Sequence, residues 1–249
     1  MCDASTKDLG RCLCVITGAS KGFGRSLAQQ MPCVLQTGSV MLLVARTARL
    51  LQELKAELDT HVLLVHCVEA DLGTAEGVNK TVEVAKKENV NDFDHVLLIN
   101  NAGSLGAISQ FSSFTDLAEV NAYISFNISS ALALTAGLLQ AFPQRPGLRR
   151  TVVNMSSVLA HQPLPLWVLY STAKAARDMM FKVLAKEEPN VKVLNYSPGP
   201  VDTEMQREIF QQTGVSRELL PCQKPGAKLL KLLLDSDFCS GTHLDFLDL

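Results

Sequence analysis

Short apolar runs alternate with longer helical patterns along most of the chain, and this alternation restricts the fold more than any other sequence feature. Strand candidates rich in leucine and β-branched residues occupy residues 12–17, 40–45, 62–68, 95–100, 151–156 and 191–197. Helix candidates lie between them at 23–35, 48–58, 75–87, 117–141 and 170–187. The strand candidates lack strict polar alternation, so we expect helices to cover both of their faces.

This order of elements predicts an α/β fold, a single Rossmann-type doubly wound parallel sheet with helices on both faces. The 249 residues suit one domain, 1–249. Right-handed crossovers place the carboxyl ends of the strands along one edge, where ligands bind. Pro32 is expected to kink or end the first helix. The least regular stretch, about 204–226, is either a mobile lid or a surface connection, and we expect it to border the substrate.

The charge and cysteine content narrow the class of protein. A formal net charge of −2 gives no electrostatic reason to expect nucleic acid or an anionic membrane as partner. The seven cysteines form no C-x-x-C pair and no His cluster accompanies them, so no metal site is expected. A polar start without a secretory pattern and an odd cysteine count predict a cytoplasmic protein with reduced thiols. We identify no apolar run that approaches the roughly 20 residues of a membrane helix.

A glycine-rich stretch joins the first strand candidate to the first helix candidate. Gly18 permits a tight turn, Gly22 lets backbone approach a pyrophosphate, and Gly24 lets helix and strand pack closely. The helix N-terminus supplies N–H groups and the positive end of a dipole for phosphates. The alternative is a glycine-rich turn without a ligand, but the position at the first strand–helix junction favours a dinucleotide site.

The end of the second strand indicates which nicotinamide cofactor is used. An NAD site usually has Asp or Glu there, whereas this chain has Ala45 followed by Arg46. Arg46 can bind a 2′-phosphate bidentately and Lys21 can add a second positive charge, which favours NADPH over NADH. The alternative is that both are solvated surface charges. Asp71 either accepts from the adenine amino group or caps a helix.

A tyrosine, a lysine and a serine form the candidate catalytic group. Tyr170 and Lys174 are four residues apart on one helix face, and Ser157 lies thirteen residues upstream after a strand. Carbonyl reduction needs a proton donor at oxygen, which Tyr170 can supply. We expect Lys174 and an oxidised nicotinamide to lower the tyrosine pKa from its usual value near 10. The alternative is an ordinary i,i+4 Tyr/Lys pair.

Together with three further motifs, these residues resemble the short-chain dehydrogenase/reductase family. The N-N-A-G element is Asn100 to Gly103, the tetrad asparagine matches Asn127, and the P-G-x-x-x-T element runs from Pro198 to Thr203. The resemblance implies that Asn127 helps to hold a proton-relay water, so the implied catalytic residues are Ser157, Tyr170, Lys174 and Asn127. The implied cofactor contacts are Gly18, Ser20, Lys21, Gly22, Phe23, Gly24, Ala45, Arg46, Ala70, Asp71, Asn101, Ala102, Gly103, Tyr170, Lys174, Pro198, Gly199, Val201 and Thr203.

Within that family, several runs and the tail 241–246 are similar to a pterin-reducing subfamily. There a tail carboxylate anchors the pterin, and Asp245 is the matching residue; the alternative is a charged surface residue. The implied substrate contacts are Ser157, Tyr170, Gly199 and Asp245. The segment between Thr203 and a last helix at 224–234 is shorter than the subfamily pattern, which leaves substrate identity less constrained than the cofactor.

The resemblance implies NADPH-dependent reduction of a pterin side-chain carbonyl, as in tetrahydrobiopterin biosynthesis. A broader carbonyl reductase of the same family and a non-catalytic NADPH-binding protein are the alternatives. It also implies a homodimer, because the helices at 117–141 and 170–187 pair across a dimer interface in this family.

Overall fold

The computed structural model describes residues 7–58 and 63–248, and within them the strands form one seven-stranded sheet. All neighbouring strands are parallel, in the order β3-β2-β1-β4-β5-β6-β7. The strands are β1 (Cys12–Thr17), β2 (Ser39–Ala45), β3 (Leu63–Glu69), β4 (His95–Asn100), β5 (Arg149–Met155), β6 (Val191–Ser197) and β7 (Thr242–Asp245). The predicted α/β class and doubly wound parallel sheet are therefore confirmed.

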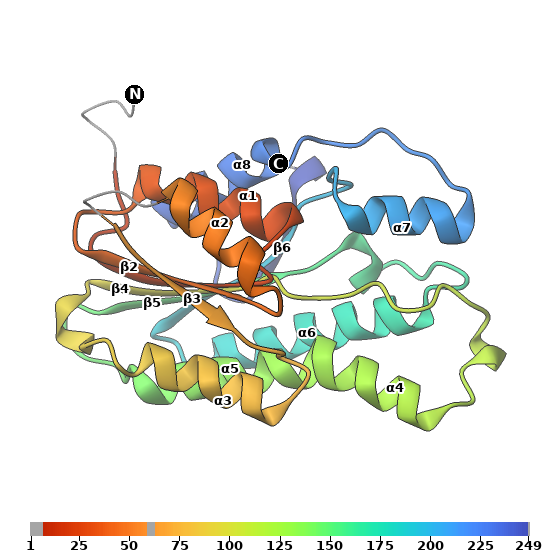
Figure 1. The fold of residues 1–249 in the computed structure, drawn as a ribbon, viewed down its shortest axis with the longest axis horizontal. Helices are drawn as coiled ribbons and strands as arrows, with labels where there is room; N and C mark the ends of the chain where they lie inside the picture. The colour runs from red at the N-terminus through yellow and green to blue at the C-terminus, as the bar shows by residue number, and fades with distance from the viewer. Residues whose placement is uncertain (1–6, 59–62, 249) are drawn as a thin grey trace.

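Helices cover both faces of the sheet (Figure 1). On one face lie α1 (Gly22–Gln30), α2 (Ala48–Leu58) and α8 (Gln223–Asp235), and on the other α3 (Ala75–Ala85), α5 (Ser130–Ala141) and α6 (Val168–Glu187). Each layer encloses its own apolar core: Leu27, Leu51 and Leu229 pack on the first face, and Leu134 and Phe181 on the second. Two faces that are both buried explain why the strands read as continuous apolar runs.

Two more helices extend past the sheet at the right of Figure 1, beyond the carboxyl ends of the strands. These are α4 (Leu117–Ile124) and α7 (Glu204–Thr213). Short helical turns complete the chain: η1 (Met31–Val34), η2 (Val90–Asp92), η3 (Phe111–Ser113), the π-helical turn η4 (Ser125–Ser129), η5 (Val158–Ala160) and η6 (Phe246–Asp248).

Most predicted elements agree with the structure to within two residues at each end. The first helix is the main exception: it ends at Gln30 and continues as η1 with Pro32 in its first turn, which is the early stop expected from that proline. The prediction that the stretch 204–226 is irregular is partly wrong, because α7 forms within it. Strand β7 was missed. One end of the strand predicted at 62–68 falls on Val62, outside the described residues.

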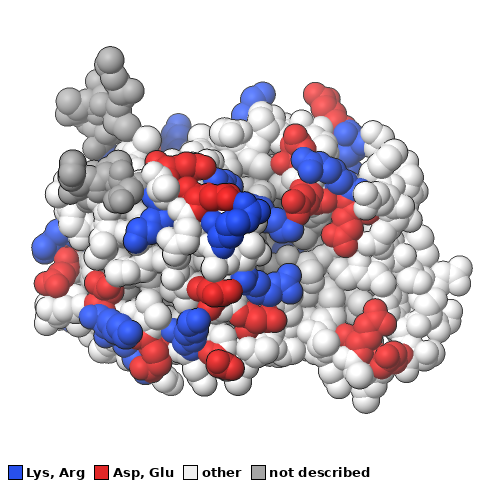
Figure 2. All heavy atoms as spheres, viewed as in Figure 1, with Lys and Arg blue, Asp and Glu red and all other residues white. Residues whose placement is uncertain are grey.

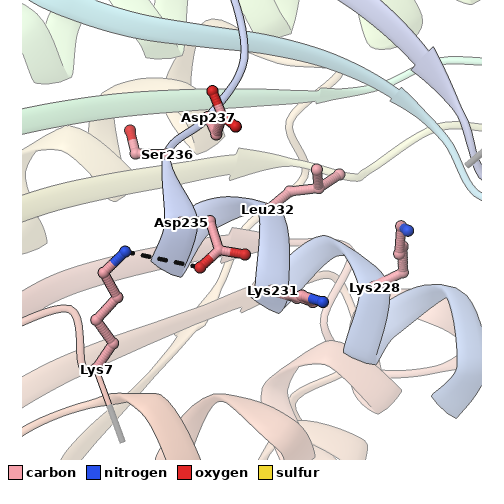
Figure 3. A pocket seen from close by; sticks show the side chains of 7 residues that line it. All are labelled: Lys7, Lys228, Lys231, Leu232, Asp235, Ser236 and Asp237. Atoms are coloured by element: carbon pink, nitrogen blue, oxygen red, sulfur yellow. Dashed lines mark ion pairs between the residues drawn. The ribbon is translucent and has the colours of Figure 1, made fainter.

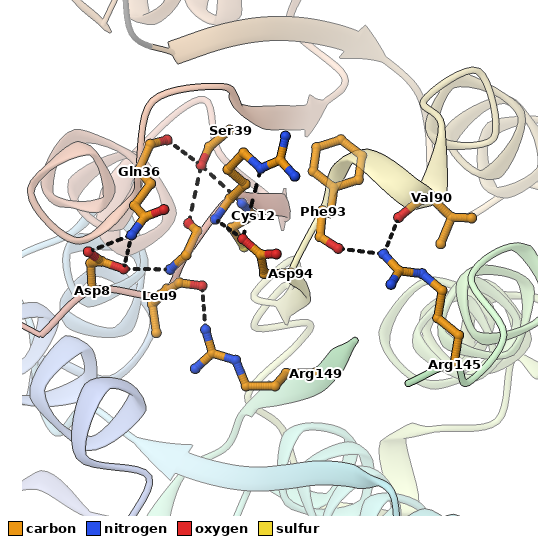
Figure 4. A network of polar contacts seen from close by, with 12 residues as sticks. Asp8, Leu9, Cys12, Gln36, Ser39, Val90, Phe93, Asp94, Arg145 and Arg149 are labelled. Carbon is orange, nitrogen blue, oxygen red and sulfur yellow. Dashed lines mark hydrogen bonds and ion pairs between the residues drawn. The ribbon is translucent and has the colours of Figure 1, made fainter. Parts of the chain in front are cut away.

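Arginine side chains close the amino-terminal edge of the sheet (Figure 4). Arg149, at the start of β5, donates from Nη2 to the Leu9 carbonyl at 2.7 Å. Arg145 donates from one nitrogen to the carbonyls of Val90 and Phe93 at 2.7 and 2.6 Å. These bonds hold the segments that enter β1, β4 and β5, so this edge is occupied by structural contacts. The carboxyl edge is left for ligands.

One segment among the described residues, Leu117–Ala141, is long and apolar enough by length and composition to cross a membrane. The expectation that no run approaches this length was therefore wrong. The inner side of the segment packs in the core through Leu134 and Leu138, and Thr135 accepts a hydrogen bond from Asn100 Nδ2 at 2.9 Å. These are the contacts of a core helix.

Gly77, in the first turn of α3, offers a test of how tightly this layer is packed. Alanine is normally better than glycine in a helix by about 1 kcal/mol, but a Cβ at Gly77 would overlap the Asp71 carbonyl. We therefore expect Gly77→Ala to lower the free energy of unfolding by about 1–3 kcal/mol in urea titrations. Asn79→Ala, at an exposed position of the same helix, is the control and should be neutral or slightly stabilising. Equal behaviour of the two variants would contradict the packing described here.

Candidate functional site

A cavity of about 630 Å³ opens at the carboxyl edge of the sheet. Most of the predicted site residues line it: Gly18, Ser20, Lys21, Gly22, Phe23, Ala45, Arg46, Ala70, Asn101, Ala102, Gly103, Ser157, Tyr170, Lys174, Pro198, Gly199, Val201, Thr203 and Asp245. Three predicted residues, Gly24, Asp71 and Asn127, lie outside this lining. Met205, Ile209 and Arg217 also line the cavity, so the segment 204–226 borders it as expected.

The glycine loop between β1 and α1 has the geometry of a phosphate cradle. Gly18 and Gly22 have φ values of +67° and +57°, which favour glycine. A Cβ on Gly24 would overlap the Gly18 carbonyl and the Asn101 amide, which explains its close helix–strand packing. Helix α1 has neither a capping side chain nor an acidic residue in its first turn. Its N–H groups and dipole are therefore suited to a phosphate group.

Thr17 and Asn101 fasten this loop to the end of β4. The Asn101 amide donates to the carbonyls of Thr17 and Gly18 at 2.8 and 3.3 Å. In return, Thr17 Oγ1 accepts from the N–H groups of Asn101 and Ala102, both at 2.9 Å. Sequence reasoning placed Asn101 at the cofactor but overlooked Thr17. The sequence feature that could have identified Thr17 is its position as the polar last residue of an otherwise apolar strand.

Arg46 lies where a 2′-phosphate would be recognised. It is exposed at the cavity rim, and its guanidinium carbon lies 5.7 Å from the centre of the Phe126 ring. Lys21 is also exposed, but its ammonium forms an ion pair with Glu204 at the start of α7. The carboxylate-free end of β2 and the stacked Arg46 fit NADPH. Lys21 would have to leave Glu204 before it could contribute.

Asp71 does not cap α3, so that alternative is wrong. Thr74 caps the helix by accepting from the Gly77 N–H at 3.1 Å. The Asp71 carboxylate instead accepts from the Gly73 N–H at 2.9 Å, within its own turn. The adenine contact stays a prediction.

Ser157, Tyr170 and Lys174 meet at the centre of the cavity. Ser157 follows β5, and its hydroxyl accepts from the Leu159 N–H at 3.2 Å. Burial raises the pKa of Tyr170, while the hydrogen bond with Ser157 and the charge of Arg177 act in the opposite direction. The net direction of the Tyr170 pKa is upward, and its lowering by Lys174 together with an oxidised nicotinamide stays a prediction. The phenol is held in its protonated form.

Lys174 lies above the ring of Tyr170, with its ammonium 5.4 Å from the ring centre. It donates to the Met155 carbonyl at 2.7 Å. Burial lowers the pKa of Lys174 to about 7, the charge of Arg177 adds to this, and Asp178 opposes it. A lysine with this pKa exchanges protons readily near neutral pH.

Asn127 lies in the π-helical turn η4 between α4 and α5. Its side chain accepts from the Ser104 N–H at 2.8 Å and donates to Ser104 Oγ and the Tyr123 carbonyl, both at 3.0 Å. These contacts occupy the amide, so the side chain positions the loop after β4. The Asn127 backbone carbonyl accepts from Arg177 Nη1 at 3.5 Å, and a part of Asn127 in a proton relay stays a prediction.

Arg177 is a buried cation that the sequence analysis did not identify. It is 2% exposed, and it donates to the Asn154 side chain at 2.7 Å and to the carbonyls of Asn100 and Ala102 at 2.5 and 3.0 Å. The signal for it was periodicity, because positions 170, 174 and 177 lie on one face of a helix.

The opposite wall is built by the turn after β6. Gly199 has a φ of +76°, and Thr203 precedes α7 with its hydroxyl donating to the Val201 carbonyl at 3.3 Å. Asp245 ends β7, is half-buried and lines the cavity, while its role as a substrate anchor stays a prediction. One Asp245 oxygen accepts from the Leu247 N–H at 2.9 Å.

A second hollow of about 600 Å³ lies between the N-terminal segment and the end of α8 (Figure 3). Lys7 pairs there with Asp235 at 3.7 Å, and the other walls carry Lys228, Lys231 and Asp237. These groups offer no acid–base pair of the kind found at the sheet edge. On the face in Figure 2, blue and red side chains are interleaved, without the single-sign surface typical of nucleic-acid binding.

Comparison with known proteins places this site in context. Residues 13–214 match the family model described as short chain dehydrogenase. Sepiapterin reductase of Rattus norvegicus is 47% identical over 97% of this chain and 98% of its own length. Sepiapterin reductase of Xenopus tropicalis is 45% identical, with 98% and 100% covered. A short-chain dehydrogenase/reductase structure from Saccharomyces cerevisiae superposes with a TM-score of 0.79 at 25% identity, covering 95% of this chain and 96% of that one.

The glycine loop, the Ser157, Tyr170 and Lys174 group and the turn after β6 all lie in one cavity, as the sequence resemblance implied. The chain therefore belongs to the short-chain dehydrogenase/reductase family of oxidoreductases.

Proposed function

We propose that this protein is an NADPH-dependent reductase of a pterin side-chain carbonyl. The observation that carries the proposal is one cavity that joins three features: the Tyr170 and Ser157 pair, the Arg46 rim and the half-buried carboxylate of Asp245. The similarity to sepiapterin reductases over nearly the full length of the chain supports the same activity.

The cofactor end of the cavity fits a dinucleotide phosphate. The N-terminus of α1 and the backbone of Gly18 and Gly22 would hold the pyrophosphate, and Arg46 would hold the 2′-phosphate. The turn from Pro198 to Thr203 would hold the carboxamide, and Lys174 the ribose hydroxyls. When bound, NADPH supplies the hydride.

At the reacting carbonyl, this chain supplies the proton. Ser157 orients the carbonyl oxygen, and the protonated phenol of Tyr170 donates to it. Lys174, with its pKa of about 7, is placed to restore the phenol proton. Arg177 favours tyrosinate during the transfer because its charge acts on Tyr170 without being exposed to water.

At the substrate end, Asp245 would accept the adjacent N–H donors of a 2-amino-4-oxo pterin edge. One of its oxygens already accepts from Leu247, which fixes the carboxylate and leaves the other oxygen for a ligand. Trp167 and Leu159 supply apolar walls for the ring. The runner-up is a broader carbonyl reductase, which the shorter segment after Thr203 favours.

A cytoplasmic homodimer completes the proposal. Large apolar side chains are exposed along α4, α5 and α6, among them Leu117 at 70%, Leu132 at 55% and Met179 at 61%. A second copy of this chain would cover this surface.

NADPH preference should depend on Arg46. We expect Arg46→Ala to weaken NADPH binding by about ten- to a hundred-fold, because a charged hydrogen bond of about 1.5–3 kcal/mol is lost, while NADH binding stays unchanged. Titration calorimetry with both cofactors measures this. Arg49→Ala is the matched control, since Arg49 pairs with Glu53 on α2 outside the cavity. An Arg46→Ala variant with wild-type preference would remove Arg46 from the assignment.

Turnover should depend on the Tyr170 hydroxyl. We expect Tyr170→Phe to keep NADPH binding and lose about 10²–10⁴-fold in kcat, the usual contribution of a positioned proton donor. Stopped-flow and steady-state assays with sepiapterin separate binding from turnover. Tyr196→Phe, which removes a hydroxyl bonded to the Pro225 carbonyl, should keep its kcat. Near-normal turnover in the Tyr170 variant would show that another acid acts.

Asp245 distinguishes the pterin reductase from the broader carbonyl reductase. We expect Asp245→Asn to lower kcat/KM for sepiapterin by about ten- to a hundred-fold and to leave a small diketone nearly unaffected, because the diketone lacks the pterin edge. Asp237→Asn, at an exposed position between α8 and β7, controls for charge. Equal losses on both substrates, with an unchanged Tm, would exclude a pterin-specific role.

A further inference from the structure

Two histidines and an aspartate converge outside the cavity lining described above. His161 follows η5, Asp178 lies in α6, and His243 lies in β7. Asp178 Oδ2 lies 2.6 Å from His243 Nδ1 and 3.0 Å from His161 Nε2, and the two nitrogens are 3.1 Å apart. Three atoms of the kinds that bind metals therefore point to one centre.

If hydrogen bonds alone hold these three side chains together, the placement of protons between them is unfavourable. Both imidazole nitrogens lie within hydrogen-bond distance of the same carboxylate oxygen and of each other, so two protonated nitrogens would lie 3.1 Å apart with no hydrogen bond between them. If one nitrogen is bare, its lone pair faces the carboxylate at hydrogen-bond distance. A cation in the centre would accept all three lone pairs at once.

The separations suit a small transition-metal ion. Ligand atoms around a tetrahedral ion bound at about 2.1 Å lie about 3.4 Å apart, so the separations of 2.6, 3.0 and 3.1 Å in this cluster would each widen by less than about 1 Å. Two imidazoles and one carboxylate form a common zinc ligand set with a fourth position for water. His161 is 44% exposed, which gives the ion access from solvent.

The surrounding groups orient the ligands as they do around bound metals. His243 Nε2 lies 2.9 Å from Ser197 Oγ, so a proton on that nitrogen leaves Nδ1 bare for the centre. The other Asp178 oxygen accepts from Asn154 Nδ2 at 3.1 Å. Asp178 itself is 1% exposed. The Asn154 hydrogen bond thus holds the carboxylate in place.

We propose that His161, Asp178 and His243 form a zinc-binding site that is separate from the catalytic cavity. Arg177 does not block it, because its donors go to Asn154 and to backbone carbonyls of other elements. The ion would join three elements that also carry site residues: η5 follows Ser157, α6 carries Tyr170 and Lys174, and β7 ends at Asp245. Zinc would therefore stabilise the relative positions of η5, α6 and β7, and with them the catalytic residues.

The test is direct metal binding by the full chain, first stripped with a chelator. With Zn²⁺ we expect one ion per chain by equilibrium dialysis and a rise in Tm on the order of 5 °C at saturation. With Co²⁺ as a probe we expect the visible bands of a tetrahedral ion without the near-ultraviolet thiolate band. A thiolate band would overturn the proposal, because cysteines would then be the ligands. The absence of stoichiometric uptake would overturn it as well, because the chain would then have no such site.

His161→Gln is the decisive variant because the side chain is exposed and its loss leaves the buried Asp178–His243 bond intact. We expect zinc affinity to fall at least tenfold, since even groups that only orient ligands are worth about 10–100-fold. His66→Gln, which removes a histidine paired with Glu88, is the control and should bind zinc like the wild type. Undiminished binding by the His161 variant would overturn the proposal, whatever the activity on pterins.

Discussion

The site depends on the hydrogen bonds that the buried guanidinium of Arg177 donates. Its donors reach backbone carbonyls at the end of β4 and the Asn154 side chain on β5, so one charged group ties the catalytic helix α6 to two central strands. A buried cation costs several kcal/mol unless it is fully hydrogen-bonded, about the scale of a domain's whole stability. Arg177 meets this condition because four acceptors surround it.

The same charge shapes the chemistry. Because Arg177 lies one turn after Lys174, it helps to lower the lysine pKa and draws the tyrosine pKa downward against burial. Asp178 offsets part of this field, and His161, which follows η5, and His243 of β7 contact that carboxylate. Stability and proton transfer thus rely on one set of buried groups, and a change to any of them would alter both.

The two edges of the sheet have different roles: the amino edge carries structural contacts and the carboxyl edge carries the cavity. Arginines bind backbone carbonyls at the amino edge, where Arg145 and Arg149 hold the entering loops. At the carboxyl edge β1 ends in the polar residue Thr17, whose hydrogen bonds hold Asn101 and Ala102 in the wall of the cavity. A parallel sheet makes this asymmetry possible because all of its strands end on the same side.

Local sequence patterns were enough to predict which residue types take part in the chemistry and where they lie along the chain. The glycine loop, the Tyr170 and Lys174 spacing and the acid-free end of β2 each follow from short-range geometry, and each lies where it was expected. The early end of the first helix, at Gln30 just before Pro32, was predictable for the same reason. Strand β7 was not, because its four residues are half-buried and carry no apolar run.

What only the tertiary structure decided depends on contacts between distant residues. Lys21 pairs with Glu204, Asn127 binds Ser104, and His161 meets Asp178 and His243, although nothing in the spacing of these residues links them. The upward pKa of Tyr170 is likewise a property of burial, which is set by the assembled cavity. The sequence alone determined the fold class and the residue types of the chemistry, because both are encoded by neighbours along the chain. The partners and charges of those residues were decided by packing, because burial and long-range electrostatics exist only after the chain has folded.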